Sequence, residues 1–179
     1  MNALIVVDVQ NDFCPGGALP APEGDRIVPV INELMNKFNI IVASRDTHPP
    51  NSRHFDKWPV HCVRATKGAA FHPDLDITKI EKELLKGTDD KDDGYSAFEA
   101  TNENLYKYLK NNQVTDVYIT GLTTEYCIKN TALDSIHQGF GTYVVTDAIA
   151  PVEPDSDNER NALAEMKEKG IILISAKEL

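Results

Sequence analysis

The most constraining feature of this sequence is its regular change between two kinds of apolar pattern. Short, continuous apolar runs are typical of strands buried on both faces of a sheet, and they lie at residues 4–7, 40–44, 83–86, 116–121, 142–146 and 171–174. Apolar residues at helical spacing lie between several of these runs, at about residues 25–37, 101–110, 127–139 and 157–169. The alternation predicts an α/β fold: three α/β/α layers around a mostly parallel, doubly wound sheet.

Length and composition exclude several classes of protein. The 179 residues fit one domain, residues 1–179. A net charge of −10 argues against nucleic-acid or membrane partners, because both bind basic surfaces. Three unevenly spaced cysteines do not suggest a disulfide framework. With no recognisable signal peptide, a cytoplasmic location is expected, and the sequence leaves open whether the chain forms a homo-oligomer.

Four polar positions are expected at one edge of the sheet. Asp8, Asp46 and Lys86 each end a predicted strand, and the turn that leads to Cys127 follows another. Ligands of open α/β sheets bind beyond the carboxyl ends of the strands. These side chains should therefore face a common crevice.

Three of these residues form a candidate catalytic group: Asp8, Lys86 and Cys127. The predicted position of Cys127 in the first turn of a helix should lower its pKa and favour a nucleophilic thiolate. A carboxylate could accept the thiol proton, and an ammonium group would stabilise developing negative charge. The competing interpretation is that Cys127 is a small apolar residue between helix and sheet.

The loop over residues 46–78 contains a candidate metal site, because three of the five histidines stand close together in it, at residues 48, 54 and 61. Asp46 and His48 are two residues apart on an extended segment, and the stiff Pro49-Pro50 pair could return His54 and His61 to the same centre. Imidazole and carboxylate suit Zn, Fe or Mn. The alternative is an ordinary solvent-exposed polar loop.

Several motifs, in order along the chain, resemble those of the nicotinamidase family of isochorismatase-like hydrolases. They are DVQNDF (8–13), RDTHPP (45–50), WPVHCV (58–63), GAAFHP (68–73), KGT (86–88), YSAF (95–98) and GLTTEYC (121–127). The combination of the metal loop with WPVHCV is specific to nicotinamidases within this superfamily. The resemblance implies the isochorismatase-like hydrolase fold and the hydrolysis of nicotinamide to nicotinate and ammonia, in NAD salvage.

The resemblance also implies roles for the residues that match. Cys127 would be the nucleophile that forms a thioester, Asp8 the general acid and base, and Lys86 their electrostatic partner. A single divalent metal ion, zinc by preference, would orient the pyridine ring. Its ligands would be Asp46, His48, His54 and His61.

Further expectations concern the pocket itself. The resemblance implies a cis peptide bond between Leu122 and Thr123, with the backbone N–H groups of Thr123 and Cys127 forming an oxyanion hole. Flat apolar walls for nicotinamide, or for the related pyrazinamide, could come from three aromatic residues, namely Phe13, Trp58 and Tyr95.

Two other functions remain to be compared with nicotinamide hydrolysis. A related cysteine amidohydrolase could use the same three residues on a carbamoyl or ureido amide. A non-enzymatic α/β binding module could hold a structural metal, although closed structural sites favour cysteine ligands. Dinucleotide binding is disfavoured, because no Gly-x-Gly-x-x-Gly motif follows the first strand.

Overall fold

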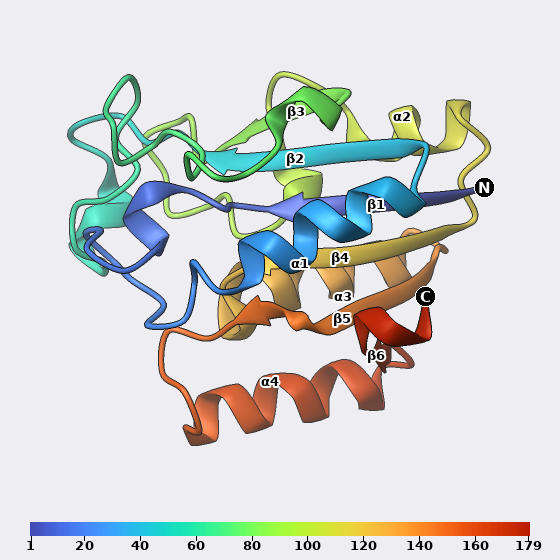
Figure 1. Cartoon of the computed structure of the whole chain (residues 1–179). Helices are drawn as coiled ribbons and strands as arrows, with labels where there is room; N and C mark the ends of the chain where they lie inside the picture. Colours follow the sequence, from blue (N-terminus) through green and yellow to red (C-terminus); the bar gives the residue numbers. More distant parts are fainter.

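The computed structural model describes residues 1–179 and contains one six-stranded sheet (Figure 1). All neighbouring strands are parallel, in the order β3-β2-β1-β4-β5-β6. The predicted α/β fold is confirmed, and the sheet is parallel throughout. Its strands are β1 (Asn2–Val7), β2 (Ile40–Asp46), β3 (Lys82–Lys86), β4 (Asp116–Leu122), β5 (Gly141–Ala150) and β6 (Ile172–Ile174).

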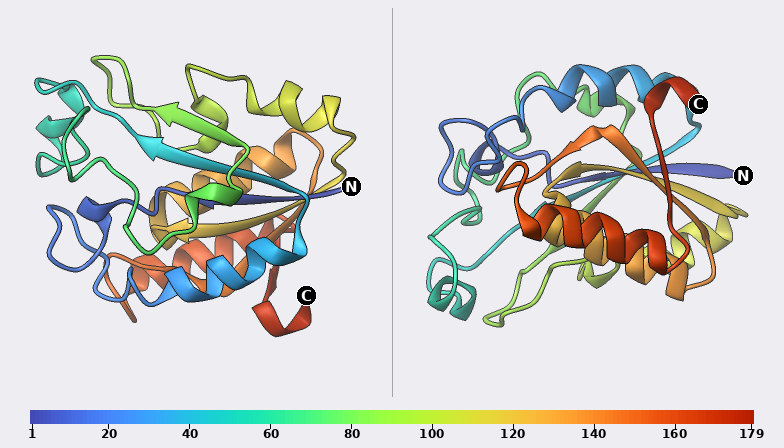
Figure 2. Two further views of the ribbon diagram at one scale, coloured as in Figure 1. Left: turned by 45° about the horizontal axis from the view of Figure 1, so that its top comes forward. Right: turned by 90° about the horizontal axis from the view of Figure 1, so that it is seen from below.

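Helices cover both faces of the sheet and produce the three layers (Figure 2). The helix α1 lies on one face, while α2, α3 and α4 lie on the other. No helix combines the length and apolar character needed to cross a membrane. The bounds are α1 (Ile27–Leu34), α2 (Leu105–Asn111), α3 (Lys129–His137) and α4 (Asp157–Glu168).

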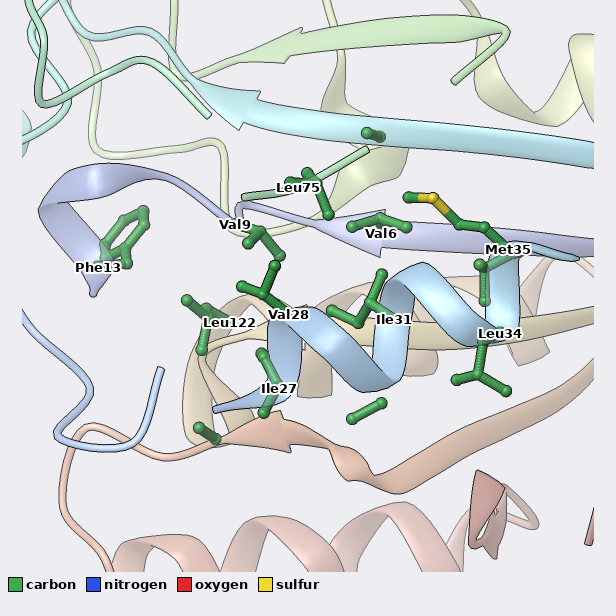
Figure 3. Packing of buried hydrophobic residues seen from close by; sticks show 14 of the residues in the cluster. Val6, Val9, Phe13, Ile27, Val28, Ile31, Leu34, Met35, Leu75 and Leu122 are labelled. Atoms are coloured by element: carbon green, nitrogen blue, oxygen red, sulfur yellow. The ribbon is translucent and has the colours of Figure 1, made fainter. Parts of the chain in front are cut away.

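The core between α1 and the sheet shows how the apolar spacing produces this arrangement. In Figure 3, Val28 and Ile31 of α1 point toward Val9 and Val6, which lie in or just after the central strand β1. Full burial of each such side chain contributes about 1.5–3 kcal/mol from removal of apolar surface. The buried residues of α1 are Ile27, Val28, Ile31 and Leu34.

The direction of winding reverses between β1 and β4, which are neighbours at the centre of the sheet. A reversal of this kind leaves a crevice at the carboxyl ends of the two strands. Gly121 allows β4 to approach β1 closely there: its φ is +113°, and a Cβ would lie 2.0 Å from the Val7 carbonyl oxygen. Glycine is thus required immediately before the turn that leads to Cys127.

The second helix begins later than the predicted residue 101. Asn102 instead bonds the backbone of the edge strand β3, accepting from Leu85 N at 2.8 Å and donating to Glu83 O at 2.9 Å. The helix starts where the Asn104 side chain caps it by accepting from Lys107 N. Pairing with a sheet edge therefore competes successfully with helix extension at residues 101–104.

Candidate active site

The catalytic candidates meet at the carboxyl edge of the sheet, where a buried carboxylate and a buried thiol lie beside one ammonium group. Lys86 Nζ lies 2.7 Å from Asp8 Oδ2 and 3.5 Å from Cys127 Sγ. Lys86 and Asp8 are fully buried, and Cys127 is 7% exposed. The structure therefore brings together Asp8, Lys86 and Cys127, three residues that are far apart in the sequence.

Asp8 is held in an uncommon backbone conformation just after β1. Its φ is +49°, a region that non-glycine residues rarely adopt and that often marks functional sites. The Ser44 hydroxyl donates to Asp8 Oδ1 at 2.7 Å, and Asp8 N donates to Ser44 O at 3.1 Å. The neighbouring strand β2 thus fixes the carboxylate, with Oδ2 toward Lys86.

Burial and ion pairing act in opposite directions on the charges of this group. Burial raises the pKa of Asp8 to about 6, despite the opposing effect of the Lys86 ammonium. Burial would lower the pKa of Lys86, but the carboxylates of Asp46 and Asp8 raise it well above its usual value. Lys86 therefore remains charged, while Asp8 can exchange a proton near neutral pH.

The predicted low pKa of Cys127 is wrong. Burial raises its pKa well above the usual value, and the carboxylates of Asp8 and Asp46 add to this effect against the opposing Lys86 ammonium. The electrostatic benefit expected from a helix start is smaller than the cost of placing a thiolate in a buried site beside two carboxylates. Cys127 therefore rests as a thiol and needs a base when it attacks.

The turn that carries Cys127 also differs from a regular helix start. Residues Thr124–Ile128 form a π-helical turn, and α3 begins only at Lys129. Short π segments of this kind are frequent at functional sites. The peptide bond between Leu122 and Thr123 is cis, as the family resemblance implied.

The candidate metal ligands also lie together. The imidazoles of His48, His54 and His61 have potential ligand nitrogens within 4.8 Å of one another. Asp46 Oδ2 lies 3.5 Å from His48 Nε2 and 4.0 Å from His61 Nε2. All four of these side chains are buried to at least nine tenths. The loop histidines are therefore not an ordinary solvent-exposed group.

Local backbone structure positions the side chain of each histidine. His48 N donates to Cys62 O at 3.0 Å, and Arg64 N donates to His48 O at 2.9 Å, which fastens the His61 segment beside His48. His54 lies in a short 3₁₀ helix, Arg53–Asp56, which the Ser52 side chain caps. Gly87 lies against the His48 ring, since a Cβ there would be 2.5 Å from Cε1.

The cluster has the donor chemistry of a transition-metal site. Burial lowers the pKa of His54 to about 4 and also lowers that of His61, so both rings are neutral and can donate lone pairs. His48 Nε2 is buried without a hydrogen-bond partner. Such an unpaired buried nitrogen requires an explanation, and a bound cation beside Asp46 provides one.

Asp46 connects the two groups. One of its carboxylate oxygens, Oδ1, forms an ion pair with Lys86, while Oδ2 faces the histidines. Although burial opposes it, the Lys86 ammonium and His48 hold the pKa of Asp46 well below its usual range. The Asp46 carboxylate therefore stays charged between the catalytic candidates and the metal-site candidates.

A small pocket opens above both groups. Its mainly apolar and aromatic lining, with a few polar groups, is typical of small-molecule sites. The predicted aromatic residues all line it, and Trp58 Nε1 donates to the Tyr95 hydroxyl at 2.9 Å. The lining consists of Phe13, Leu19, Asp46, His54, Trp58, His61, Gly94, Tyr95, Thr123, Tyr126, Cys127 and Val152.

Sequence reasoning missed two buried residues that fix the surroundings of the pocket. Gln10 brackets Asp46, accepting from its N–H at 2.8 Å and donating to its carbonyl at 2.9 Å. Glu125 accepts from Val152 N and Glu153 N, both at 3.0 Å, and ties that pocket-lining loop to the Cys127 turn. Gln10 stands within a recognised motif, but nothing local predicts the partner of either side chain.

Comparison with known proteins places this geometry in a family. A model of the Isochorismatase domain matches residues 2–178. The nicotinamidase of Acinetobacter baylyi is 37% identical over 201 aligned residues, which cover 99% of this chain and 94% of that protein. The chain therefore belongs to the isochorismatase family.

Solved structures give the same result at a finer level. The pyrazinamidase of Pyrococcus horikoshii in complex with zinc has a TM-score of 0.87 and 46% identity, covering 97% of this chain and 98% of that chain. PnC1 from L. infantum in complex with nicotinate has a TM-score of 0.93 and 30% identity, covering 99% and 93%. Within the isochorismatase family, the chain belongs with the nicotinamidases and pyrazinamidases.

Proposed function

We propose that this protein is a nicotinamidase that hydrolyses nicotinamide to nicotinate and ammonia. The observation that carries the proposal is the shared position of a buried Asp8–Lys86–Cys127 group and a histidine cluster under one small aromatic pocket. The first group supplies the residues for amide hydrolysis. The second group could hold a metal ion, which would bind the ring nitrogen of a pyridine substrate. The names of similar proteins, which include nicotinamidases and a pyrazinamidase, support the same substrates.

In the first half of the reaction, Cys127 attacks the amide carbon. Its thiol proton passes to Asp8, which burial prepares to accept and release protons near pH 6. The new C–S bond leaves a negative charge on the amide oxygen, which the backbone N–H groups of Thr123 and Cys127 stabilise. One such donor contributes roughly 3 kcal/mol to lowering the barrier.

Collapse of this intermediate breaks the C–N bond, and Asp8 returns its proton to the departing ammonia. Water then attacks the thioester while Asp8 takes its proton. When the C–S bond breaks, Asp8 passes that proton to the Cys127 sulfur, and the new carboxylic acid releases its own proton to solvent and leaves as nicotinate. Lys86 keeps its proton throughout. Its ammonium group stabilises the Asp8 carboxylate and the sulfur, at 2.7 Å and 3.5 Å.

Asp46, His48, His54 and His61 would hold a divalent metal ion, most suitably zinc. When bound, such an ion supplies an electrophilic contact that orients the pyridine nitrogen of the substrate. Phe13, Trp58 and Tyr95 provide the walls that keep the ring in register and exclude water. An unpaired His48 Nε2 and two neutral rings support this ligand set.

The decisive experiment measures ammonia release from nicotinamide before and after exhaustive chelation, with single metals added back. We expect activity with nicotinamide and pyrazinamide, its loss on chelation and its recovery with Zn²⁺. A ureido amide serves as the competing substrate. Turnover of that compound with none of nicotinamide would contradict the proposal and favour a carbamoyl-amide hydrolase.

A further inference from the structure

The acidic turn between β3 and Tyr95 contains a carboxylate that contacts a metal-site histidine. Asp92 Oδ1 lies 3.1 Å from His54 Nδ1. The Asp92 side chain is 26% exposed, whereas that of His54 is only 5% exposed. Asp92 therefore reaches the buried ring from the solvent side.

The three histidines of the cluster share one arrangement, and His54 differs only in the kind of acceptor. His48 Nδ1 lies 3.1 Å from Gly87 O, and His61 Nδ1 lies 2.6 Å from Pro59 O. An oxygen acceptor at Nδ1 places the ring proton there and leaves the lone pair on Nε2. Two of the three acceptors are backbone carbonyls, whereas His54 uses a charged side chain.

We propose that Asp92 is a positioning residue for the metal site and acts through His54. It keeps the His54 proton on Nδ1, fixes the orientation of the ring and raises the basicity of Nε2. Carboxylate partners of this kind typically change metal affinity by about 10–100-fold. The inference rests on the metal site of the proposed function and does not depend on the substrate.

A different role for Asp92 has to be separated from this one. Its carboxylate also forms an ion pair with Lys57 and accepts from the Tyr95 hydroxyl at 2.7 Å. Through these contacts Asp92 could simply hold the loop in place. The Lys57 side chain is 68% exposed and its ion pair is with Asp92. Its backbone N–H donates to His54 O at 3.3 Å, a contact that Lys57→Ala keeps, so removal of the side chain tests the loop role.

The experiment measures Zn²⁺ affinity by competition with a chromophoric chelator, using the full chain without substrate. We expect Asp92→Ala to weaken zinc binding by about 10–100-fold. Asp92→Asn should fall in between, because its amide oxygen still accepts the hydrogen bond but carries no charge. Lys57→Ala and the loop control Asp89→Ala, which removes a pair with Lys91 at 3.4 Å, should stay within roughly threefold of the original protein.

Two results would overturn the inference: unchanged zinc affinity in Asp92→Ala, or an equal loss in Lys57→Ala. Absence of zinc binding by the unmodified protein would overturn it as well. Zinc binding with no release of ammonia from nicotinamide would instead contradict the proposed function and leave the role of Asp92 standing. If Asp92→Ala fails to fold by circular dichroism, Asp92→Asn carries the test, with unchanged affinity counting against the role of the charge.

Discussion

The catalytic group and the histidine cluster are neighbours, but they are built in different ways. Lys86, Asp46 and Asp8 stand at or just after the ends of β3, β2 and β1, and Cys127 follows β4. These four strands are consecutive in the sheet, so backbone ladders fix the spacing of the proposed catalytic side chains. The regular scaffold delivers this group almost by itself.

The histidines, by contrast, come from irregular chain after β2. His48, His54 and His61 depend on a 3₁₀ turn, an isolated bridge to Val63 and acceptors supplied by other loops. Only Asp46 belongs to both regions, with one oxygen toward Lys86 and the other toward the histidines. The comparison shows that the sheet positions the proposed catalytic side chains, whereas the loops orient the histidine rings. A substitution in one region should therefore impair that region and leave the other intact.

The largest expected effect comes from Cys127→Ala. Without the sulfur no thioester can form, and kcat for ammonia release should fall by at least about 10⁴-fold. Zinc affinity should not change, because the histidines and their acceptors are untouched. Substantial hydrolysis by the purified variant would contradict the role of Cys127 as nucleophile, and a parallel loss of zinc binding would show that the two regions are not separate.

Lys86→Met should cause the next largest effect, now on stability. The variant leaves Asp8 and Asp46 buried without their counter-ion, and breaking a buried ion pair in this way costs about 3–5 kcal/mol. Urea denaturation measures the loss. Lys129→Met is the matched control, since it removes a partly exposed pair with Glu165 at 3.2 Å and should cost at most about 1 kcal/mol.

A smaller change is expected when a loop ligand is removed. His61→Ala should weaken Zn²⁺ binding by roughly 100-fold or more, since loss of a ligand exceeds the loss of a supporting contact. The midpoint of urea denaturation should move less than in Lys86→Met. His72→Ala, outside the cluster, serves as the control, and unchanged zinc affinity in His61→Ala would remove that residue from the ligand set.

The smallest effect is a pH dependence that belongs to the sheet-borne group. Burial raises the pKa of Asp8 to about 6, so the carboxylate that accepts the thiol proton is lost as the pH falls through that value. The kcat/KM for nicotinamide should therefore decrease about tenfold per pH unit on the acid side. Steady-state rates on zinc-saturated enzyme measure this profile, and full activity at about pH 4 would contradict the role of Asp8.

Much of the fold was predictable because local pattern and tertiary structure agree. All six apolar runs are strands, and α4 begins at the expected residue 157, where the Ser156 side chain accepts a hydrogen bond from Glu159 N at 3.1 Å. The second helix was misplaced at its start, since the Asn102 side chain pairs with β3 instead. A local propensity could not reveal a partner seventeen to nineteen residues away.

The candidate site also has one part that local sequence predicts and another that only the tertiary structure shows. The sequence by itself determined which residues end the strands, and for parallel strands that is enough to place Asp8, Asp46, Lys86 and Cys127 at one edge. It also determined the histidine loop, through motif and composition.

Only the tertiary structure decided the charge states and the supporting contacts. Cys127 rests as a thiol because burial and two carboxylates outweigh the helix start and the single Lys86 ammonium. His54 gains Asp92 as a partner, 38 positions further along the chain. The physical reason is that electrostatic and hydrogen-bond energies depend on distance and burial in space, which strand order and loop closure create and which neighbouring residues in the sequence do not contain.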